Sequence, residues 1–218
     1  MAAELWTITW FSLATALAAT VLMAPPGLAL GWVLARRRFP GKALVETLVS
    51  LPLVLPPVAT GYILLTILGR RSSLGRWLED GGLEILFTWK AVVLAMTVMG
   101  LPLFVRTVRA GFEQVNERFE QVAATLGASV ARTFFSISLP LARRFVLAGA
   151  ILGFSRALGE FGATVMVAGS MPGRTRTLAV SLYTFAETGQ DRAAVAVLVI
   201  VFGIAFAAVW ASNRLAAS

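Results

Sequence analysis

The chain alternates between long apolar runs and short polar connections. Five runs are long enough to cross the ~30 Å hydrocarbon core of a membrane as helices that rise ~1.5 Å per residue. They cover residues 5–35, 43–69, 83–105, 145–168 and 193–211. The pattern predicts an all-α membrane protein with about five transmembrane helices, folded as a single transmembrane domain over residues 1–218.

Prolines interrupt the first two runs. Pro25-Pro26-Gly27 falls inside the first run, where it is expected to kink the helix. In the second run, Pro56 and Pro57, followed by Thr60 and Gly61, are expected to break the helix about halfway along. Two interpretations stay open here: a static kink, or a gate whose irregular backbone lines a cavity.

Composition supports a chain dissolved in lipid. Hydrophobic residues make up 58% of it, charged residues 14%, and the mean hydropathy is +0.81; a soluble domain carries about 25% charged residues. There is no cysteine and no histidine, which removes thiolate ligands, the commonest metal ligand and the usual general base. Neither GxxxxGK[ST] nor GxSxG occurs. We therefore expect no metal site and no catalytic role.

The net charge is +8, so the chain is expected to lie against an anionic partner such as lipid or nucleic acid. The basic residues cluster between apolar runs, which favours anionic membrane lipid over nucleic acid. The connections after the first and third runs, with the C-terminal tail, hold 11 of the 19 Lys and Arg residues; the other side holds 7, and Arg156 lies within a run. The positive-inside rule then predicts the N-terminus outside and the C-terminus inside.

The polar stretch EQVAATLGASVARTFFSISLP, residues 120–140, separates the third and fourth runs. Gly127 suits the left-handed conformation that ends a helix, and Ser129 suits the cap of a second helix over residues 130–138, which Pro140 is expected to limit. Helical spacing places five apolar residues on one face: Phe112, Val115, Phe119, Val122 and Leu126. The stretch predicts two short helices with a glycine bend, a compact knob; the alternative is an ordinary amphipathic segment at the membrane surface.

This stretch resembles the EAA loop of ABC-importer permeases, in which EAA is followed by a glycine and an Ile-x-Leu-Pro sequence. The spacing of the glycine and of the Ile-x-Leu-Pro sequence matches, but Gln121 stands at the usual glutamate, one residue after Glu120, and Val122 replaces the first alanine. The resemblance implies a cytoplasmic coupling loop, about residues 110–144, that receives the motion of a separate ATPase. Its implied contact residues are Glu120, Gln121, Ala123, Gly127, Ile137, Leu139 and Pro140.

Three further segments resemble the molybdate-transport permeases: FSRALGEFGATVMVAG (154–169), PGRTRTL (172–178) and LPLVLPPVATGYILL (51–65). Related sulfate and thiosulfate permeases share much of the pattern. The resemblance implies a type I ABC-importer permease fold and a homodimer in the bacterial inner membrane. It also implies two cytosolic ATPase subunits that bind ATP and Mg, a periplasmic or surface oxyanion-binding protein, and no cofactor on this chain.

The implied function is ATP-driven import of a tetrahedral oxyanion through alternating access, with molybdate or tungstate favoured and sulfate or thiosulfate as the alternative. A secondary anion transporter is the alternative from another class. Such a transporter usually has more helices and two repeated halves. No internal repeat relates the five runs.

Arg156 and Glu160 are the charged pair of the fourth run. At a spacing of four they share a face of the fourth run, and Arg156 lies ~18 Å along the helix from Arg144, near mid-membrane. A charge there needs a partner. The pair is either an internal salt bridge that fixes packing or part of a translocation pathway. The candidates for pathway or gate are Pro57, Thr60, Gly61, Ser155, Arg156, Glu160 and Thr164.

Overall fold

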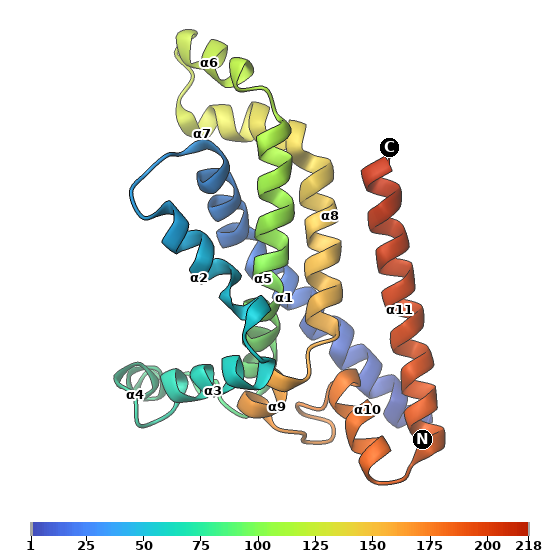
Figure 1. The fold of residues 1–218 in the computed structure, drawn as a ribbon. Helices are drawn as coiled ribbons and strands as arrows, with labels where there is room; N and C mark the ends of the chain where they lie inside the picture. The colour runs from blue at the N-terminus through green and yellow to red at the C-terminus, as the bar shows by residue number, and fades with distance from the viewer. Residues whose placement is uncertain (1, 218) are drawn as a thin grey trace.

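The computed structural model describes residues 2–217, and every regular element in that range is helical (Figure 1). Four helical stretches are long and apolar enough to cross a membrane: α1 (Ala2–Arg36), α5 (Trp89–Gln114), Val130–Leu158 and the part of α11 (Asp191–Ala217) up to Ser212. A fifth span results if α2 (Lys42–Val54) and α3 (Pro57–Leu68) are counted together. The prediction of an all-α membrane protein with about five spans is confirmed.

Helix α5 forms the centre of the bundle, and α1 and α8 (Leu139–Leu158) pack against it. Glycines bring the helices close: a Cβ atom at Gly27 would lie 2.3 Å from the Phe104 ring, and one at Gly31 would lie 2.9 Å from Val108. Lipid gives helices little hydrophobic reason to associate, so small residues that permit close van der Waals contact hold the bundle together.

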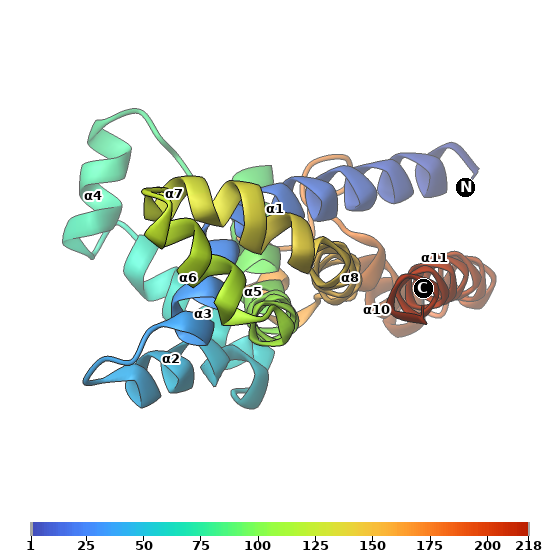
Figure 2. The ribbon, with the colours of Figure 1, turned by 90° about the horizontal axis from the view of Figure 1, so that it is seen from above.

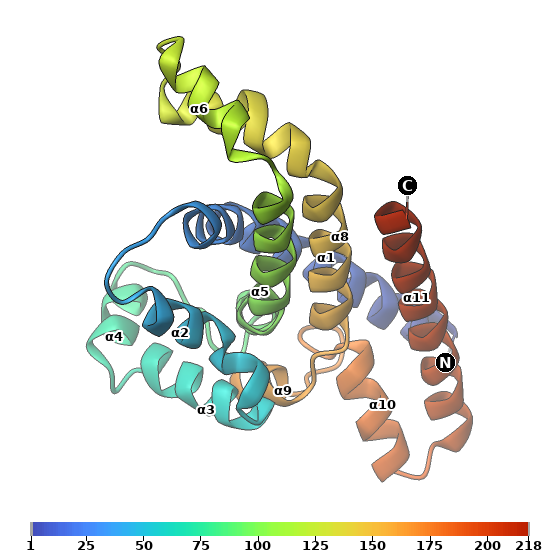
Figure 3. The same cartoon turned by 45° about the horizontal axis from the view of Figure 1, so that its top comes forward.

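The proline-containing runs behave differently from each other. Helix α1 continues through Pro25 and Pro26, where the tight packing of the next residue, Gly27, on α5 holds the segment, as neighbouring helices commonly do for membrane prolines. The kink at this point stays a prediction. In the second run the break is sharper than a kink, because α3 is bent by 114° relative to α2 (Figure 3).

Two consecutive prolines explain the sharp break in the second run. Leu55 and Pro56 have extended backbone, with ψ of 143° and 132°, and a residue that precedes proline is disfavoured in the helical region. Pro57 then occupies the first turn of α3, where a missing N–H is tolerated. The break turns α3 towards α9 (Gly162–Ala168), on which it packs.

Short helices occupy the two ends of the bundle. Helices α6 (Glu117–Thr125) and α7 (Val130–Thr133) project beyond the ends of α5 and α8 (Figure 1) and lie across the bundle when it is viewed from above (Figure 2). Helices α4 (Ser73–Asp80) and α10 (Leu178–Glu187) lie towards the opposite end.

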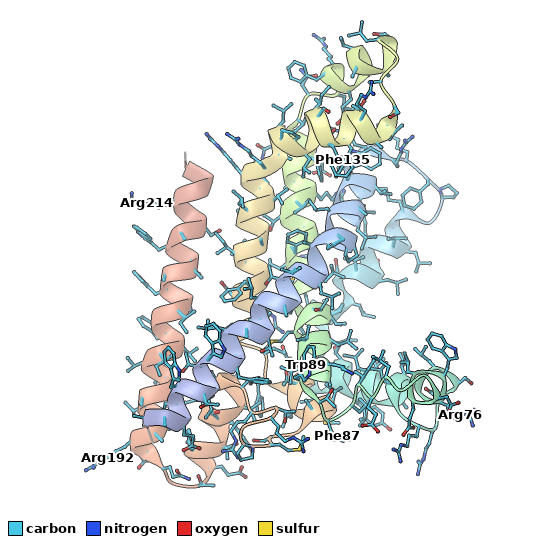
Figure 4. The ribbon with its side chains drawn as sticks, turned by 180° about the vertical axis from the view of Figure 1, so that it is seen from behind. Arg76, Phe87, Trp89, Phe135, Arg192 and Arg214 are labelled. Carbon is cyan, nitrogen blue, oxygen red and sulfur yellow. The ribbon has the colours of Figure 1, made fainter. Side chains whose placement is uncertain are left out.

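Helix α11 lies to one side of the bundle and runs from Arg192, at the end of the bundle opposite α6, to Arg214 (Figures 2 and 4). The helices α1 and α11 both begin at that end. The compartment that each end faces remains the prediction made from the loop charges.

Candidate coupling loop and translocation contact

The segment between α5 and α8 forms two helices joined by a glycine bend. The side-chain oxygen of Asn116 accepts a hydrogen bond from the backbone N–H of Arg118 (3.0 Å) and caps the start of α6. Gly127 follows α6 with φ of 82°. The Ser129 hydroxyl then accepts from the N–H of Arg132 (3.3 Å) and caps α7. The predicted two-helix loop, its glycine bend and its serine cap are confirmed.

The predicted apolar stripe is divided between two helices. Helix α5 continues to Gln114, and Val115 has extended backbone between α5 and α6. Phe112 and Val115 are buried in the transmembrane core, where Phe112 packs on Phe134 with ring centroids 5.8 Å apart. The prediction of one continuous helical face over residues 112–126 is therefore wrong, because α5 ends at Gln114 and α6 begins at Glu117.

The second helix of the loop does not end near Pro140. Helix α7, a π-helical turn (Phe134–Ser138) and α8 follow one another without a break, so that Val130–Leu158 is one helical stretch. Pro140 lies in the first turn of α8, immediately after the π-helical turn. A widened turn alters the i→i−4 pattern that a proline ring disrupts, so the prediction that Pro140 limits the helix is wrong.

Glu120 faces the bundle rather than solvent. The Nε atom of Arg36 donates to both carboxylate oxygens of Glu120 (2.9 and 3.0 Å), and the hydroxyl of Ser138 donates to one of them (2.7 Å). The same guanidinium donates through Nη2 to the carbonyl oxygen of Val115 (2.7 Å). The side chains of Arg36 and Glu120 are only 6% and 17% exposed. Sequence reasoning counted Arg36 only as an orienting charge and missed this contact.

The other predicted coupling residues differ in burial. Gln121, Gly127 and Pro140 are exposed, Ala123 is buried, and Ile137 and Leu139 are half-buried. Large apolar residues are nevertheless exposed in this segment. Figure 4 labels one of them, Phe135. We call this set the loop face: Phe119, Val122, Leu126, Val130 and Phe135.

The predicted gate residues of α3 meet α9. A Cβ atom at Gly61 would lie 2.7 Å from the Cα of Ala163, and one at Gly162 would lie 2.8 Å from the Cβ of Pro57. The two backbones touch with no room for a side chain. The contact thus brings Pro57, Thr60 and Gly61 from the second run up to the helix that carries Thr164.

Two hydroxyl groups on these packed helices lack partners. Thr60 and Thr164 are 5% and 0% exposed, and neither hydroxyl forms a hydrogen bond to any described residue. A buried hydroxyl without a partner costs about 1–3 kcal/mol. Within the described residues, α3 and α9 thus each carry a buried hydroxyl without a protein partner.

Arg156 and Glu160 form an ion pair, but not along one helix. Helix α8 ends at Leu158 and α9 begins at Gly162, so Glu160 lies in the junction. The Nη1 atom of Arg156 lies 2.7 Å from one Glu160 oxygen, and the other oxygen accepts from the N–H of Ala163 (2.8 Å). The prediction that the pair shares a helical face is wrong, because the helix ends between the two residues.

The remaining pathway candidate, Ser155, lies on α8 in the turn before this junction. Its hydroxyl donates to the carbonyl oxygen of Ile151, one turn earlier in the same helix (2.8 Å). Its single proton is thus engaged within α8, and no contact joins Ser155 to Thr60 or Thr164 among the described hydrogen bonds. The structure brings Pro57 and Gly61 against Gly162 and Ala163, with Glu160 at the edge of this contact. Thr60 and Thr164 are the chain neighbours of Gly61 and Ala163.

Comparison with known proteins identifies the family. Residues 27–216 match the family described as the binding-protein-dependent transport system inner membrane component. The chain belongs to this family. The permease is therefore an inner membrane component of an ABC importer, and family membership excludes the secondary transporter considered from sequence.

Several molybdenum permeases are similar to this permease over most of its length. The molybdenum transport system permease protein ModB of Escherichia coli K12 is 41% identical over 97% of this chain and 93% of its own. The ModB protein of Haemophilus influenzae is 44% identical over 81% of this chain and 78% of its own. The sulfate transport system permease protein CysT of Escherichia coli K12 is 30% identical over 94% of this chain and 74% of its own.

Two solved structures share the fold. A bacterial ABC transporter involved in import of the acidic polysaccharide alginate superimposes with a TM-score of 0.71 at 16% identity, over 97% of this chain and 79% of the other. The MetNI methionine ABC transporter in an inward-facing conformation gives a TM-score of 0.64 at 15% identity, over 99% and 95%. The expected type I importer permease fold is confirmed.

Proposed function

We propose that the permease forms the membrane channel of an ATP-driven importer for molybdate or tungstate. The observation that carries the proposal is the 41% identity to a molybdenum permease over nearly the whole chain, against 30% to a sulfate permease. The working complex is a homodimer with two cytosolic ATPase subunits and an external oxyanion-binding protein. One coupling loop per chain suits two ATPases around a two-fold axis. Sulfate or thiosulfate is the second candidate substrate.

The loop face is proposed to dock the ATPase. Its five large apolar side chains are between 55% and 82% exposed on helices that project from the bundle. An apolar patch on an amphipathic helix fits a hydrophobic groove on a partner. ATP and Mg bind to that partner, and the permease itself catalyses nothing.

The contact of α3 with α9 is proposed as the gate. Its interhelical glycine contacts and unpartnered hydroxyls suit a surface that separates when the ATPases close. On opening, Thr60 and Thr164 gain water or the oxyanion as hydrogen-bond partners. A dianion needs attraction without being trapped, and Arg156, partly neutralised by Glu160, supplies such a field at the edge of the contact.

Reconstitution tests the substrate. The permease, its ATPase and its binding protein are placed in proteoliposomes, and ATP hydrolysis is measured with molybdate, tungstate, sulfate and thiosulfate in turn. Stimulation by molybdate and tungstate alone is expected. Stimulation by sulfate or thiosulfate would retain the importer and change its substrate, whereas failure to assemble with an ATPase would contradict the coupling role of the loop.

A matched pair of variants tests docking. Leu126 on the loop face is 82% exposed, and Leu74 on α4, near the opposite end of the bundle, is 46% exposed. Leu126→Asp is expected to reduce co-purification of the ATPase, because it places a charge in an apolar interface. Leu74→Asp carries the same chemical change and is expected to leave co-purification intact. Equal loss in both variants would show that the effect is not specific to the loop face.

A further inference from the structure

We propose that Arg36 is a positioning residue that fixes the coupling loop to α1, so that motion of the loop moves α1. The proposal rests on the proposed function, in which an ATPase drives the loop. We call the contact the Arg36 anchor: the Arg36 guanidinium, the Glu120 carboxylate, the Ser138 hydroxyl and the Val115 carbonyl.

The Arg36 guanidinium joins the end of α1 to the start of the loop and, through Glu120, to the turn that leads into α8. Arg36 is the last residue of α1. It donates to Val115 at the junction of α5 and α6, and to Glu120 within α6. Glu120 in turn accepts from Ser138 in the turn that leads into α8. The three interactions measure between 2.7 and 3.0 Å, so α6 cannot shift by a helical turn without breaking them or carrying α1 along.

Burial and hydrogen bonding fix the geometry of the Arg36–Glu120 pair. A shielded ion pair is costly to dehydrate and fixes geometry when its remaining polar atoms are satisfied. Arg36 and Ser138 satisfy the Glu120 oxygens. By contrast, Glu117 lies 3.8 Å from Arg36 with a side chain that is 64% exposed, a geometry in which ion pairs contribute little.

Aromatic packing beside the anchor joins the same segments. Phe134 in the π-helical turn lies between Trp32 of α1 and Phe112 of α5, with ring centroids 5.8 Å away in each case. The Trp32–Phe134 pair has the edge-to-face geometry that aromatic rings prefer. The end of α1 is thus held to the loop by charge and by packing.

Helix α1 connects the anchor to the far end of the bundle (Figures 1 and 3). Near its start, the Ser12 hydroxyl accepts from the N–H of Leu178, the first residue of α10 (2.8 Å, buried). A continuous helix held at Ser12 and at Arg36 is a physical route by which displacement of the loop reaches α10.

Two glutamates of α6 provide the test. The complex with ATPase and binding protein is reconstituted with Glu120→Ala, with the control Glu117→Ala, and with the double charge reversal Arg36→Glu/Glu120→Arg. ATPase co-purification, ATP hydrolysis and oxyanion uptake per ATP are measured. Glu120→Ala is expected to keep co-purification while uptake per ATP falls about tenfold, within the range of allosteric coupling. Glu117→Ala is expected to change uptake by less than about twofold, and the double reversal to recover part of the loss.

Two results would overturn the anchor. The first is unchanged uptake per ATP in Glu120→Ala. The second is a loss of co-purification that equals the loss of uptake and is not recovered in the double reversal. That result would show that the contact only stabilises the fold. If the unaltered complex shows no stimulation by any oxyanion, the proposed function fails instead. Amide hydrogen exchange over residues 115–126 of the permease alone then decides the anchor: faster exchange in Glu120→Ala than in Glu117→Ala supports it, and equal exchange overturns it.

Discussion

Arg156 and Glu160 join the end of α8 to the start of α9 through a contact of 2.7 Å. The second oxygen of Glu160 holds the N–H of Ala163, so the carboxylate caps α9 while it pairs with the guanidinium. A negative charge at the start of a helix is also favourable with respect to the helix dipole. The geometry gives the pair a structural task at the edge of the proposed gate.

The first prediction concerns this pair. Glu160 is 1% exposed, whereas the side chain of Arg156 is 27% exposed. Arg156→Gln leaves a buried carboxylate without its cation, which costs up to about 3–5 kcal/mol. Glu160→Gln is expected to cost less, because an amide oxygen can still accept from Ala163 and the Arg156 side chain is less enclosed than the carboxylate. Thermal unfolding of the purified permease should therefore show a larger decrease in Tm for Arg156→Gln.

Transport measurements distinguish the remaining interpretation of the pair. If Arg156→Gln keeps the Tm and the assembled complex but lowers uptake, the guanidinium acts on the ion in the pathway rather than on the fold. A parallel decrease in Tm and uptake identifies the ion pair as a structural element. Comparing both quantities in the same preparation is therefore essential.

Local rules predicted those features that depend on neighbouring residues. The consecutive prolines after Leu55 break the second run, the left-handed Gly127 bends the loop, and Ser129 caps α7. Each depends on backbone preferences within a few residues, which the sequence displays directly. The five apolar runs likewise follow from the thickness of the membrane.

Features that depend on where a helix ends, or on distant residues, were missed. The spacing of Phe112 and Val115 with Phe119 suggested one helix, but periodicity does not reveal a break, and the capping residue Asn116 was the available signal. The partner of Glu120 lies 84 residues earlier, at Arg36. No local pattern indicates that contact, because it arises only when α1 packs beside the loop.

A second prediction follows from the unpartnered hydroxyls of Thr60 and Thr164. Replacing either with valine removes a buried polar group that has no partner, a penalty of about 1–3 kcal/mol. Thr60→Val and Thr164→Val are each expected to raise the Tm and to slow oxyanion uptake, because the closed contact of α3 with α9 becomes more stable. Calorimetry and uptake in proteoliposomes provide the measurements.

Thr97 is the matched control for these valine variants. It is also buried, but its hydroxyl donates to the carbonyl oxygen of Val93 (2.8 Å). Thr97→Val is expected to give no increase in Tm, since it removes a satisfied hydrogen bond. If Thr60→Val or Thr164→Val lowers the Tm as much as Thr97→Val does, the hydroxyls at the proposed gate are not unsatisfied.

Close packing at Gly61 leads to the third prediction. Its Cβ position lies 2.7 Å from the Cα of Ala163 and 2.9 Å from that residue's carbonyl oxygen. Gly61→Ala must therefore push α3 away from α9, and overpacking of this kind costs about 1–3 kcal/mol. The variant is expected to lower the Tm and to raise ATP hydrolysis without substrate, because the proposed gate no longer closes fully.

Gly203 in α11 supplies the comparison for Gly61, because nothing lies within 4 Å of its Cβ position. Gly203→Ala is expected to leave the gate unaffected and to favour the helix by about 0.5–1 kcal/mol. If both alanine variants behave alike in ATP hydrolysis, the contact of α3 with α9 does not control the transport cycle.

The last prediction concerns the bend of the coupling loop. Gly127 has φ of 82°, and its N–H donates to the carbonyl oxygen of Ala124 (3.0 Å). Gly127→Pro removes that donor and demands a φ near −65°, a change that costs about 3 kcal/mol or more when the native geometry depends on both. Gly127→Ala keeps the donor, and because its Cβ position faces open space it bears only the backbone cost of about 1–2 kcal/mol.

Both Gly127 variants are expected to insert into the membrane normally, because the bend lies outside the helical spans. ATPase co-purification and ATP-coupled uptake should decrease in the order Gly127→Ala, then Gly127→Pro. Gly189, between α10 and α11, has φ of 69° and an equally open Cβ position, so Gly189→Ala applies the same backbone cost away from the loop and should leave ATPase binding unchanged. Normal ATP-coupled uptake in Gly127→Pro would contradict the proposal that a rigid bend presents the loop face to the ATPase.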